Sequence, residues 1–218
     1  MLKKLTQKEN IFKNESVIIA GAGPGNPKLI TIKVLYAIKL ADVIIYDALV
    51  NKAILSNSNK FCKLIFAGKT QNNKACTQEQ IISWIINYAK QKKKELRLKG
   101  GDPNIFGRGA EEIDYLKEKK ISFSVFSGIT ASQGALNIIG ENFISKEESC
   151  HLITGHKAIN SNTPKINFKS IAKNRGKIII YMGLNQLNYI SKNLIINGKS
   201  KNSEVVIISK ISLKKEKK

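Results

Sequence analysis

The chain is poor in cysteine, arginine, proline and tryptophan, and it has no long apolar run. Its 218 residues include three cysteines, Cys62, Cys76 and Cys150, which are too few and too widely spaced for a disulfide framework or a zinc site. No apolar run approaches the roughly 20 residues that cross a bilayer. The first fifteen residues lack the continuous apolar core of a signal peptide. These absences predict a soluble cytoplasmic protein with no membrane partner and no metal site.

Lysine dominates the charge. The chain has 37 Lys and Arg against 16 Asp and Glu, which gives a formal net charge of +21. Such a balance favours an anionic partner, but arginine occurs only at Arg97, Arg108 and Arg175, and proteins that read nucleic acid favour arginine for bidentate contacts. Lysine, asparagine and isoleucine share A- and T-rich codons, so genome composition explains much of the excess. We therefore expect no specific nucleic-acid partner, and a functional role for the charge stays open.

Short apolar runs alternate with segments of helical period. The expected strands are 17–20, 43–46, 64–66, 96–98, 123–126, 151–154, 177–181 and 204–208, and the expected helices are 29–41, 77–90, 109–120, 130–139 and 184–195. Continuous apolar strands, each followed by a helix, predict an α/β fold with a largely parallel sheet.

The texture of the sequence suggests how the chain is divided. We expect a disordered basic lead over 1–15, an N-terminal α/β domain over 16–115 and a C-terminal α/β domain over 116–218. The polar stretch 157–169 is expected to be a loop or a lid.

Glycine-rich segments follow almost every expected strand. They are GAGPGNP (21–27), AGK (67–69), KGGDP (99–103), SGIT (127–130), TGH (154–156) and YMG (181–183). Ligands of open α/β sheets bind outside the carboxyl ends of the strands, where bare backbone can approach them. GAGPG does not match the dinucleotide fingerprint, and no phosphate-binding G-x-x-x-x-G-K-[ST] is present. The segments therefore predict a ligand site at this edge, with Asp102 supplying a carboxylate.

The same segments carry a family resemblance. GAGPGNPKLITIKVLYAIKLADVIIYDALV, RLKGGDPNIFGRGAEEI, GITAS, TGH and YMGLNQ are similar, in order and spacing over about residues 16–208, to the uroporphyrinogen-III C-methyltransferases, including the methylase module of siroheme synthases. The resemblance implies a two-domain class III methyltransferase, normally a homodimer, with a largely parallel sheet in the first domain and a mixed sheet in the second. It further implies that S-adenosylmethionine binds between the domains and methylates two ring carbons of uroporphyrinogen III, giving precorrin-2.

Matching motif by motif assigns the site residues that the resemblance implies. Those that would line the cofactor site are Pro24, Gly100, Gly101, Asp102, Ile105, Thr130, Ala131 and Met182. Asp47 matches the proton acceptor of the family and Lys69 its proton donor. A carboxylate and an amine suit the proton rearrangement that follows methylation of a pyrrole carbon.

Simpler roles exist for several of these side chains. Asp47 at a strand end could cap the following turn, and Thr130 could cap a helix. Lys69 is one lysine among many. Arg108 is expected to form an ion pair with Glu111 or Glu112.

The chain also departs from the family pattern. Ala48 and Thr70 stand where the family has arginine, Lys74 replaces a histidine, and Ser127 replaces a proline. The segment after Gly140 differs, and the chain ends sooner after EVVII than the family does. Three functions therefore stay open: an active methyltransferase for uroporphyrinogen III, a homologue that binds the cofactor without turnover, and a methylase of another anionic substrate such as a corrinoid precursor or RNA.

Overall fold

The computed structural model describes residues 11–12, 16–68, 76–146, 149–157, 162–174 and 176–211. Lys69, the expected proton donor, lies outside these residues, as do Thr70 and Lys74. The chain forms two compact units, the first ending at Ala131 and the second beginning at Ser132.

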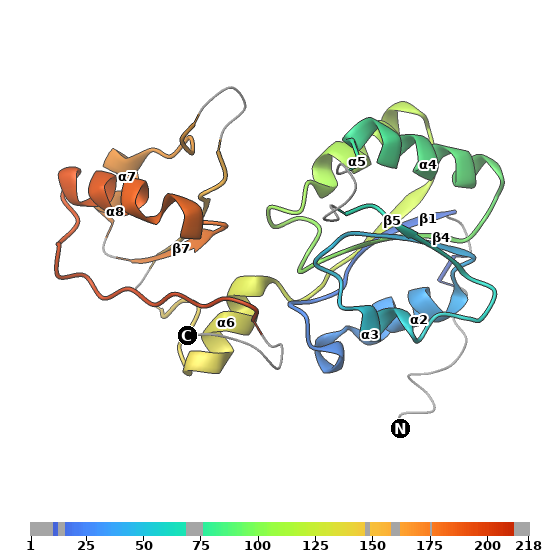
Figure 1. Cartoon of the computed structure of the whole chain (residues 1–218), viewed down its shortest axis with the longest axis horizontal. Coiled ribbons are helices and arrows are strands. Elements are labelled where there is room, and N and C mark those ends of the chain that lie inside the picture. Colours follow the sequence, from blue (N-terminus) through green and yellow to red (C-terminus); the bar gives the residue numbers. More distant parts are fainter. Residues whose placement is uncertain are drawn as a thin grey trace. The chain divides into compact units, whose positions relative to one another are not determined.

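The first unit is built on a parallel sheet. Its five strands are β1 (Val17–Gly21), β2 (Val43–Tyr46), β3 (Lys63–Phe66), β4 (Glu95–Lys99) and β5 (Phe123–Phe126), in the order β3-β2-β4-β1-β5. Figure 1 shows α2 (Ile32–Leu40) and α3 (Lys52–Leu55) on one face, and α4 (Gln78–Lys90) and α5 (Gly109–Glu118) on the other. A 3-10 turn, η1 (Pro27–Leu29), precedes α2. Because the paired strands are parallel, the loops that follow them leave from one edge of the sheet.

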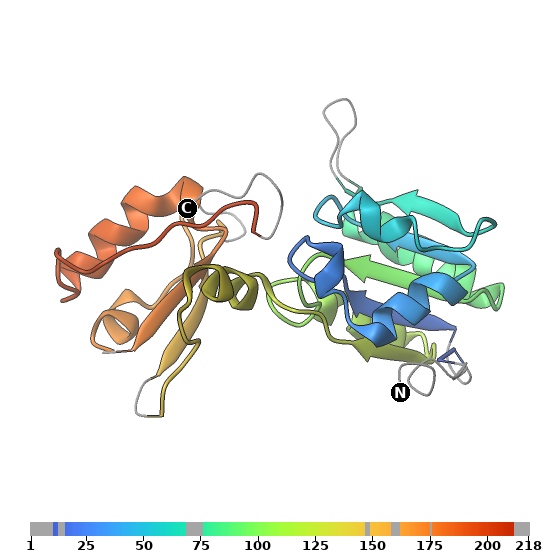
Figure 2. The same ribbon diagram turned by 90° about the horizontal axis from the view of Figure 1, so that it is seen from below.

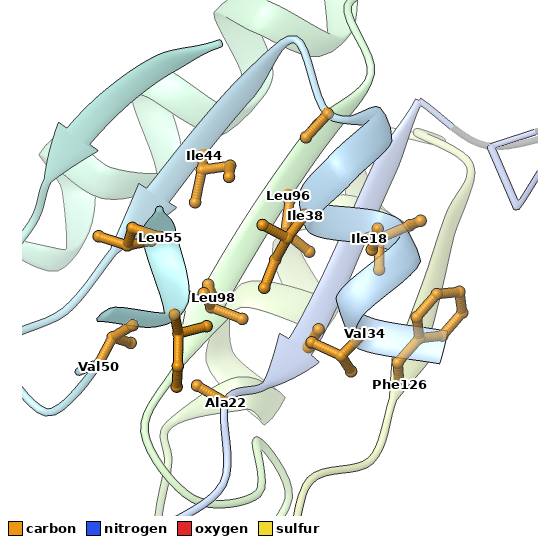
Figure 3. Close-up of a cluster of buried hydrophobic side chains, with 14 of the residues drawn as sticks. Ile18, Ala22, Val34, Ile38, Ile44, Val50, Leu55, Leu96, Leu98 and Phe126 are labelled. Carbon is orange, nitrogen blue, oxygen red and sulfur yellow. The ribbon is translucent and has the colours of Figure 1, made fainter. Parts of the chain in front are cut away.

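Strand alternation divides the apolar side chains into two cores. On the α2/α3 face, Ile18, Ile44, Leu96 and Leu98 pack with helix residues such as Ile38 (Figure 3). On the α4/α5 face, the side chains that share a cluster are Val17, Ile19, Val43, Ile45, Ile81, Ile85 and Leu116. Each fully buried Ile or Leu contributes about 1.5–3 kcal/mol by leaving water, so both faces hold the helices firmly.

Local signals set the helix starts. The Thr31 hydroxyl accepts a hydrogen bond from the Val34 N–H at 3.3 Å and caps α2. Thr77 and Gln80 form a reciprocal capping box at the start of α4. The expected helices are found with shifts of a few residues at their ends, whereas α3 was not expected.

The N-terminal lead departs from expectation at Phe12. Its side chain is 7% exposed and belongs to the α2/α3 core, with Ile11 packed against the same cluster. Burying an aromatic ring in an apolar core is more favourable than leaving it in water. The lead is therefore anchored at these two residues.

The second unit is smaller and its described strands are parallel. After α6 (Ala131–Ile139) come β6 (Cys150–Thr154), α7 (Phe168–Ala172), β7 (Lys177–Tyr181), the 3-10 turn η2 (Leu184–Gln186) and α8 (Leu187–Ile196). β6 and β7 pair in parallel, and α7 contacts α8, where the rings of Phe168 and Tyr189 meet at 5.8 Å. Figure 2 shows these elements from below.

Three expectations differ from this arrangement. The sheet of the second unit was expected to be mixed, but within the described residues it contains one parallel pair. The strand expected at 204–208 is not among the named strands there, and Val205 and Val206 are 69% and 57% exposed, since a strand needs a partner as well as an apolar run. The division was expected after residue 115, but pairing of β5 with β1 keeps β5 in the first unit.

Candidate functional site

Backbone hydrogen bonds tie the loops after β1 and β4 together. The Gly23 N–H donates to the Gly101 carbonyl at 3.1 Å, and the Gly101 N–H donates to the Gly23 carbonyl at 2.8 Å. The Ala22 N–H donates to the Lys99 carbonyl at 2.7 Å. The GAGPG and KGGDP segments thus form one surface, the loop surface, at the carboxyl edge of the sheet, as the sequence predicted.

The loop after β5 joins this surface through glycines that have no room for a side chain. A Cβ on Gly21 would lie 2.7 Å from the backbone nitrogen of Gly128, and a Cβ on Gly128 would meet the Gly101 carbonyl oxygen. Gly101 also has φ +69°, a conformation that other residues rarely adopt. The glycines therefore let three loops pack backbone against backbone.

Asp47 links the turn after β2 to the same surface. Its half-buried carboxylate accepts hydrogen bonds from the Leu49 N–H at 2.9 Å and from the Gly100 N–H at 3.3 Å. The turn-capping role is thus present, and the carboxylate also holds the start of the KGGDP loop. Its role as a proton acceptor stays a prediction.

Asp102 has a structural role in addition to the ligand contact that the sequence predicted for it. The residue is only 9% exposed, and its carboxylate accepts from the Asn104 N–H at 2.8 Å and from the Gly128 N–H at 3.0 Å. Both oxygens thus hold loops together, although each retains a further lone pair. A contact of Asp102 with a ligand would add to this structural work.

Four other predicted residues lie on these loops or directly after them. Pro24 belongs to the first loop, Ile105 to the loop after β4, and Thr130 and Ala131 stand at the start of α6. The Ala131 nitrogen would lie 3.8 Å from a Cβ on Gly101, so the start of α6 adjoins the loop surface.

Met182 lies in the second unit, directly after β7. It is 56% exposed and has φ +54°, which is unusual for a residue other than glycine. A Cβ on Gly155 would lie 2.5 Å from the Gly183 Cα, so the loops after β6 and β7 also meet through glycines. Met182 is therefore presented at the carboxyl edge of the second sheet.

Sequence reasoning missed Asn51. Its side-chain nitrogen donates to the Gly25 carbonyl at 2.8 Å, while its oxygen accepts from the Ala53 N–H and caps α3. A cap-forming residue before a short apolar run was the available signal. Asn51 fixes the outer part of the GAGPG loop.

Sequence reasoning also missed four buried ionisable residues beneath the surface. Glu95, Arg97 and Lys99 on β4 and Glu112 on α5 are at most 3% exposed. Burial raises the pKa of Glu95 to about 9, so this carboxyl is neutral at physiological pH. Burial also lowers the pKa of Lys99, followed by repulsion from Arg97, while Glu112 and Asp47 act in the opposite direction.

Arg108, by contrast, pairs at the surface. Its Nε lies 3.1 Å from the Glu111 carboxylate, which settles the choice that the sequence left between Glu111 and Glu112. Both side chains are about half exposed or more, and such pairs contribute little to stability.

Comparison with known proteins identifies the family. The sequence profile of the tetrapyrrole (corrin/porphyrin) methylases matches residues 16–218. The chain belongs to this family. It is 40% identical to the uroporphyrinogen-III C-methyltransferase of Priestia megaterium over 194 residues. The aligned region covers 88% of this chain and 81% of that protein. It is 39% identical to the siroheme synthase of Thiobacillus denitrificans over 88% of this chain, but spans only 40% of that longer protein.

Solved structures agree with this assignment. The uroporphyrin-III C-methyltransferase of Thermus thermophilus, complexed with S-adenosyl homocysteine, is 27% identical with a TM-score of 0.78, over 92% of this chain and 85% of that one. A cobalt-precorrin-4 methyltransferase of cobalamin biosynthesis, 22% identical with a TM-score of 0.80 over 93% of this chain and 83% of that one, shares the fold. The expected tetrapyrrole methylase fold is thereby confirmed.

In the described part of the chain, no helix is long and apolar enough to span a membrane. The same residues contain no group of three or more His, Cys, Asp or Glu side chains that could hold a metal ion.

Proposed function

We propose that this tetrapyrrole methylase transfers methyl groups from S-adenosylmethionine to two ring carbons of uroporphyrinogen III, giving precorrin-2 for siroheme or cobalamin formation. The observation that carries the proposal is the joined surface of the β1, β4 and β5 loops. The substrate is inferred from the names of the Priestia and Thermus relatives.

The loop surface suits S-adenosylmethionine. This molecule carries a sulfonium cation and an amino-acid head, and it needs backbone groups at close range rather than bulky side chains. Because Gly21, Gly101 and Gly128 have no Cβ atoms, the loops pack backbone against backbone, and their remaining peptide groups would serve the ligand. Gly100, Gly101, Asp102 and Ile105 would hold the cofactor from one loop.

The remaining predicted contacts come from other segments. Pro24, Thr130 and Ala131 would complete the first unit's share of the binding site. Met182, with its adaptable thioether, would contribute a soft surface for adenine from the second unit. Its 56% exposure is compatible with this role.

Methyl transfer itself is chiefly a matter of position. The sulfonium methyl and the pyrrole carbon must lie in line, and an enzyme achieves this by holding both reactants in the required orientation. The methylated ring must then rearrange its protons. Asp47 would accept a proton and Lys69 would donate one, and the contact of Asp47 with Gly100 supports its place beside the cofactor loop.

The setting of the enzyme is part of the proposal. A homodimer is expected from the family resemblance. The three cysteines all lie in the described residues and are all unpaired, which favours a reducing compartment such as the cytoplasm. The substrate carboxylates would require cations, and lysines would replace the arginines that are missing at Ala48 and Thr70.

The test is incubation of purified protein with S-adenosylmethionine and uroporphyrinogen III under anaerobic conditions. We expect a methylated tetrapyrrole and S-adenosylhomocysteine, with calorimetric binding of the latter to the free protein. Cofactor binding without any product would instead favour the homologue that has lost turnover. Methyl incorporation into RNA or another corrinoid precursor, and none into uroporphyrinogen III, would favour the third function.

A further inference from the structure

A cluster of buried ionisable side chains lines one face of β4, the strand that leads into the KGGDP loop. Because side chains alternate along a strand, Glu95, Arg97 and Lys99 project from one face of β4, the face covered by α4 and α5, and Glu112 on α5 pairs with Arg97 and Lys99. Central parallel strands are normally apolar on both faces. Placing charges at this position therefore calls for a physical reason.

One carboxylate oxygen organises this cluster. Glu112 Oε1 lies 3.0 Å from Arg97 Nε and 2.8 Å from Lys99 Nζ, and it accepts a longer hydrogen bond of 3.4 Å from the Gln78 side chain. Arg97 Nη1 donates to the carbonyls of Ile45 at 3.3 Å and Leu98 at 3.2 Å. Glu112 thus connects α5 with both β4 and α4, and through Arg97 with β2.

The Lys99–Glu112 pair closes the loop that carries the KGGDP segment. Lys99 is the last residue of β4, the loop runs over 100–108, and Glu112 lies in the first turn of the helix that follows. The Lys99 carbonyl accepts the Ala22 N–H, and the next residue donates its N–H to Asp47. Through its side chain and backbone, Lys99 therefore contacts both ends of the loop and the GAGPG segment.

The cluster is poorly suited to a purely stabilising role. Burying an ion pair costs desolvation that the pair rarely recovers, and apolar residues of similar volume often do as well or better. Glu112 Oε2 and both Glu95 oxygens are buried without a hydrogen-bond partner among the described residues. The benefit must then lie in geometry, because directed charge-assisted bonds fix positions that apolar packing leaves adaptable.

We propose that Glu112 is a positioning residue, which fixes the 100–108 loop through Lys99 and Arg97 so that the loop is ordered before S-adenosylmethionine binds. This inference rests on the proposed function for its ligand, but the order of the loop is a property of the protein alone. Asp47 is held by the same arrangement, since its contact at Gly100 begins one residue beyond Lys99.

The test separates positioning from stability. In one variant, Arg97→Met, Lys99→Met and Glu112→Leu are combined, so that no buried charge is left unpaired. Because apolar replacement of a buried ion triad is commonly neutral or stabilising, we expect its melting temperature to equal or exceed that of the native protein. Glu112→Gln is the less drastic companion, and Glu111→Gln, whose partner Arg108 is exposed, is the matched control.

Two measurements are made on each variant. Amide hydrogen exchange over residues 100–105 reports the order of the loop without any ligand, and calorimetry with S-adenosylmethionine reports binding. We expect the folded triple variant to exchange these amides faster and to bind about 10-fold or more weakly, because small displacements of a positioned group are costly. The control should match the native protein in both.

Native exchange over 100–105 in a triple variant that folds would overturn the inference, whatever its affinity. Should the triple variant not fold, the Glu112→Gln comparison decides on the same exchange criterion, at temperatures below its melting transition. If the native protein did not bind S-adenosylmethionine, the proposed function would fail, while faster exchange in the variants would still support positioning by Glu112.

Discussion

Replacing Glu95 by glutamine should stabilise the protein, and increasingly so as the pH rises. Glu95 is fully buried on the α4/α5 face of β4, and its two oxygens have no hydrogen-bond partner among the described residues. Burial raises its pKa from 4.5 to about 9. Glutamine has nearly the shape of the protonated acid and cannot ionise.

The direction in which stability changes with pH follows from proton binding. Between pH 4.5 and about 9 the folded protein keeps the Glu95 proton and the unfolded chain releases it, so the Glu95 contribution to the free energy of unfolding falls as the pH rises. Each pH unit in this window costs about 1.4 kcal/mol, which amounts to about 3 kcal/mol at neutral pH. Below pH 4.5 both states hold the proton and the penalty vanishes.

Urea unfolding at about pH 5 and about pH 8 measures this penalty. The chain has a single tryptophan, Trp84 on α4, which packs against the same core, so its fluorescence follows unfolding of the first unit. We expect the advantage of Glu95→Gln over the native protein to grow by about 2–4 kcal/mol between the two conditions. The exposed Glu118→Gln is the control. An advantage that stays constant with pH would show that Glu95 is ionised in the fold and would refute the reasoning.

The remaining predictions concern the loop surface. Asp47→Asn keeps an oxygen that accepts the Leu49 N–H of the turn and loses only the longer bond from the Gly100 N–H, so S-adenosylhomocysteine affinity measured by calorimetry should change less than about 10-fold, while turnover should fall about 100-fold or more if the carboxylate accepts a proton; equal turnover would remove that role. Asp102→Ala releases Gly128 and Asn104 and should weaken S-adenosylhomocysteine binding strongly in the same titration; native affinity would place the ligand elsewhere. Gly128→Ala should cost about 1–3 kcal/mol in urea unfolding because its Cβ meets the Gly21 and Gly101 backbone; an unchanged midpoint would mean that the loops are not packed together.

Much of the fold could be predicted because its signals are local. Apolar runs such as 17–20 and 43–46 lie on β1 and β2, and helical periodicity located α4 and α5. The short helices α3 and α7 were missed, since four or five residues cannot show a period. The run 204–208 carries strand composition, but pairing is a property of the rest of the chain.

The loop surface was predictable in position but not in detail. Glycine segments at strand ends located the surface, because repeated glycines at the carboxyl edge of a sheet indicate close approach of the backbone to another group. The hydrogen bond of Asp102 with Gly128 depends on the fold, so the sequence could not show that this carboxylate also holds two loops together. The charges at Arg97 and Lys99 interrupt an apolar strand, yet hydropathy cannot show that a glutamate from α5 covers them.

The most direct test of the account is the mass of the tetrapyrrole recovered after anaerobic incubation of the protein with uroporphyrinogen III and S-adenosylmethionine labelled with a trideuterated methyl group. The account predicts a product carrying two labelled methyl groups on carbon, with two molecules of S-adenosylhomocysteine formed for each molecule of product. Recovery of unlabelled uroporphyrinogen III alone would contradict it, provided that Trp84 fluorescence shows the protein to be folded.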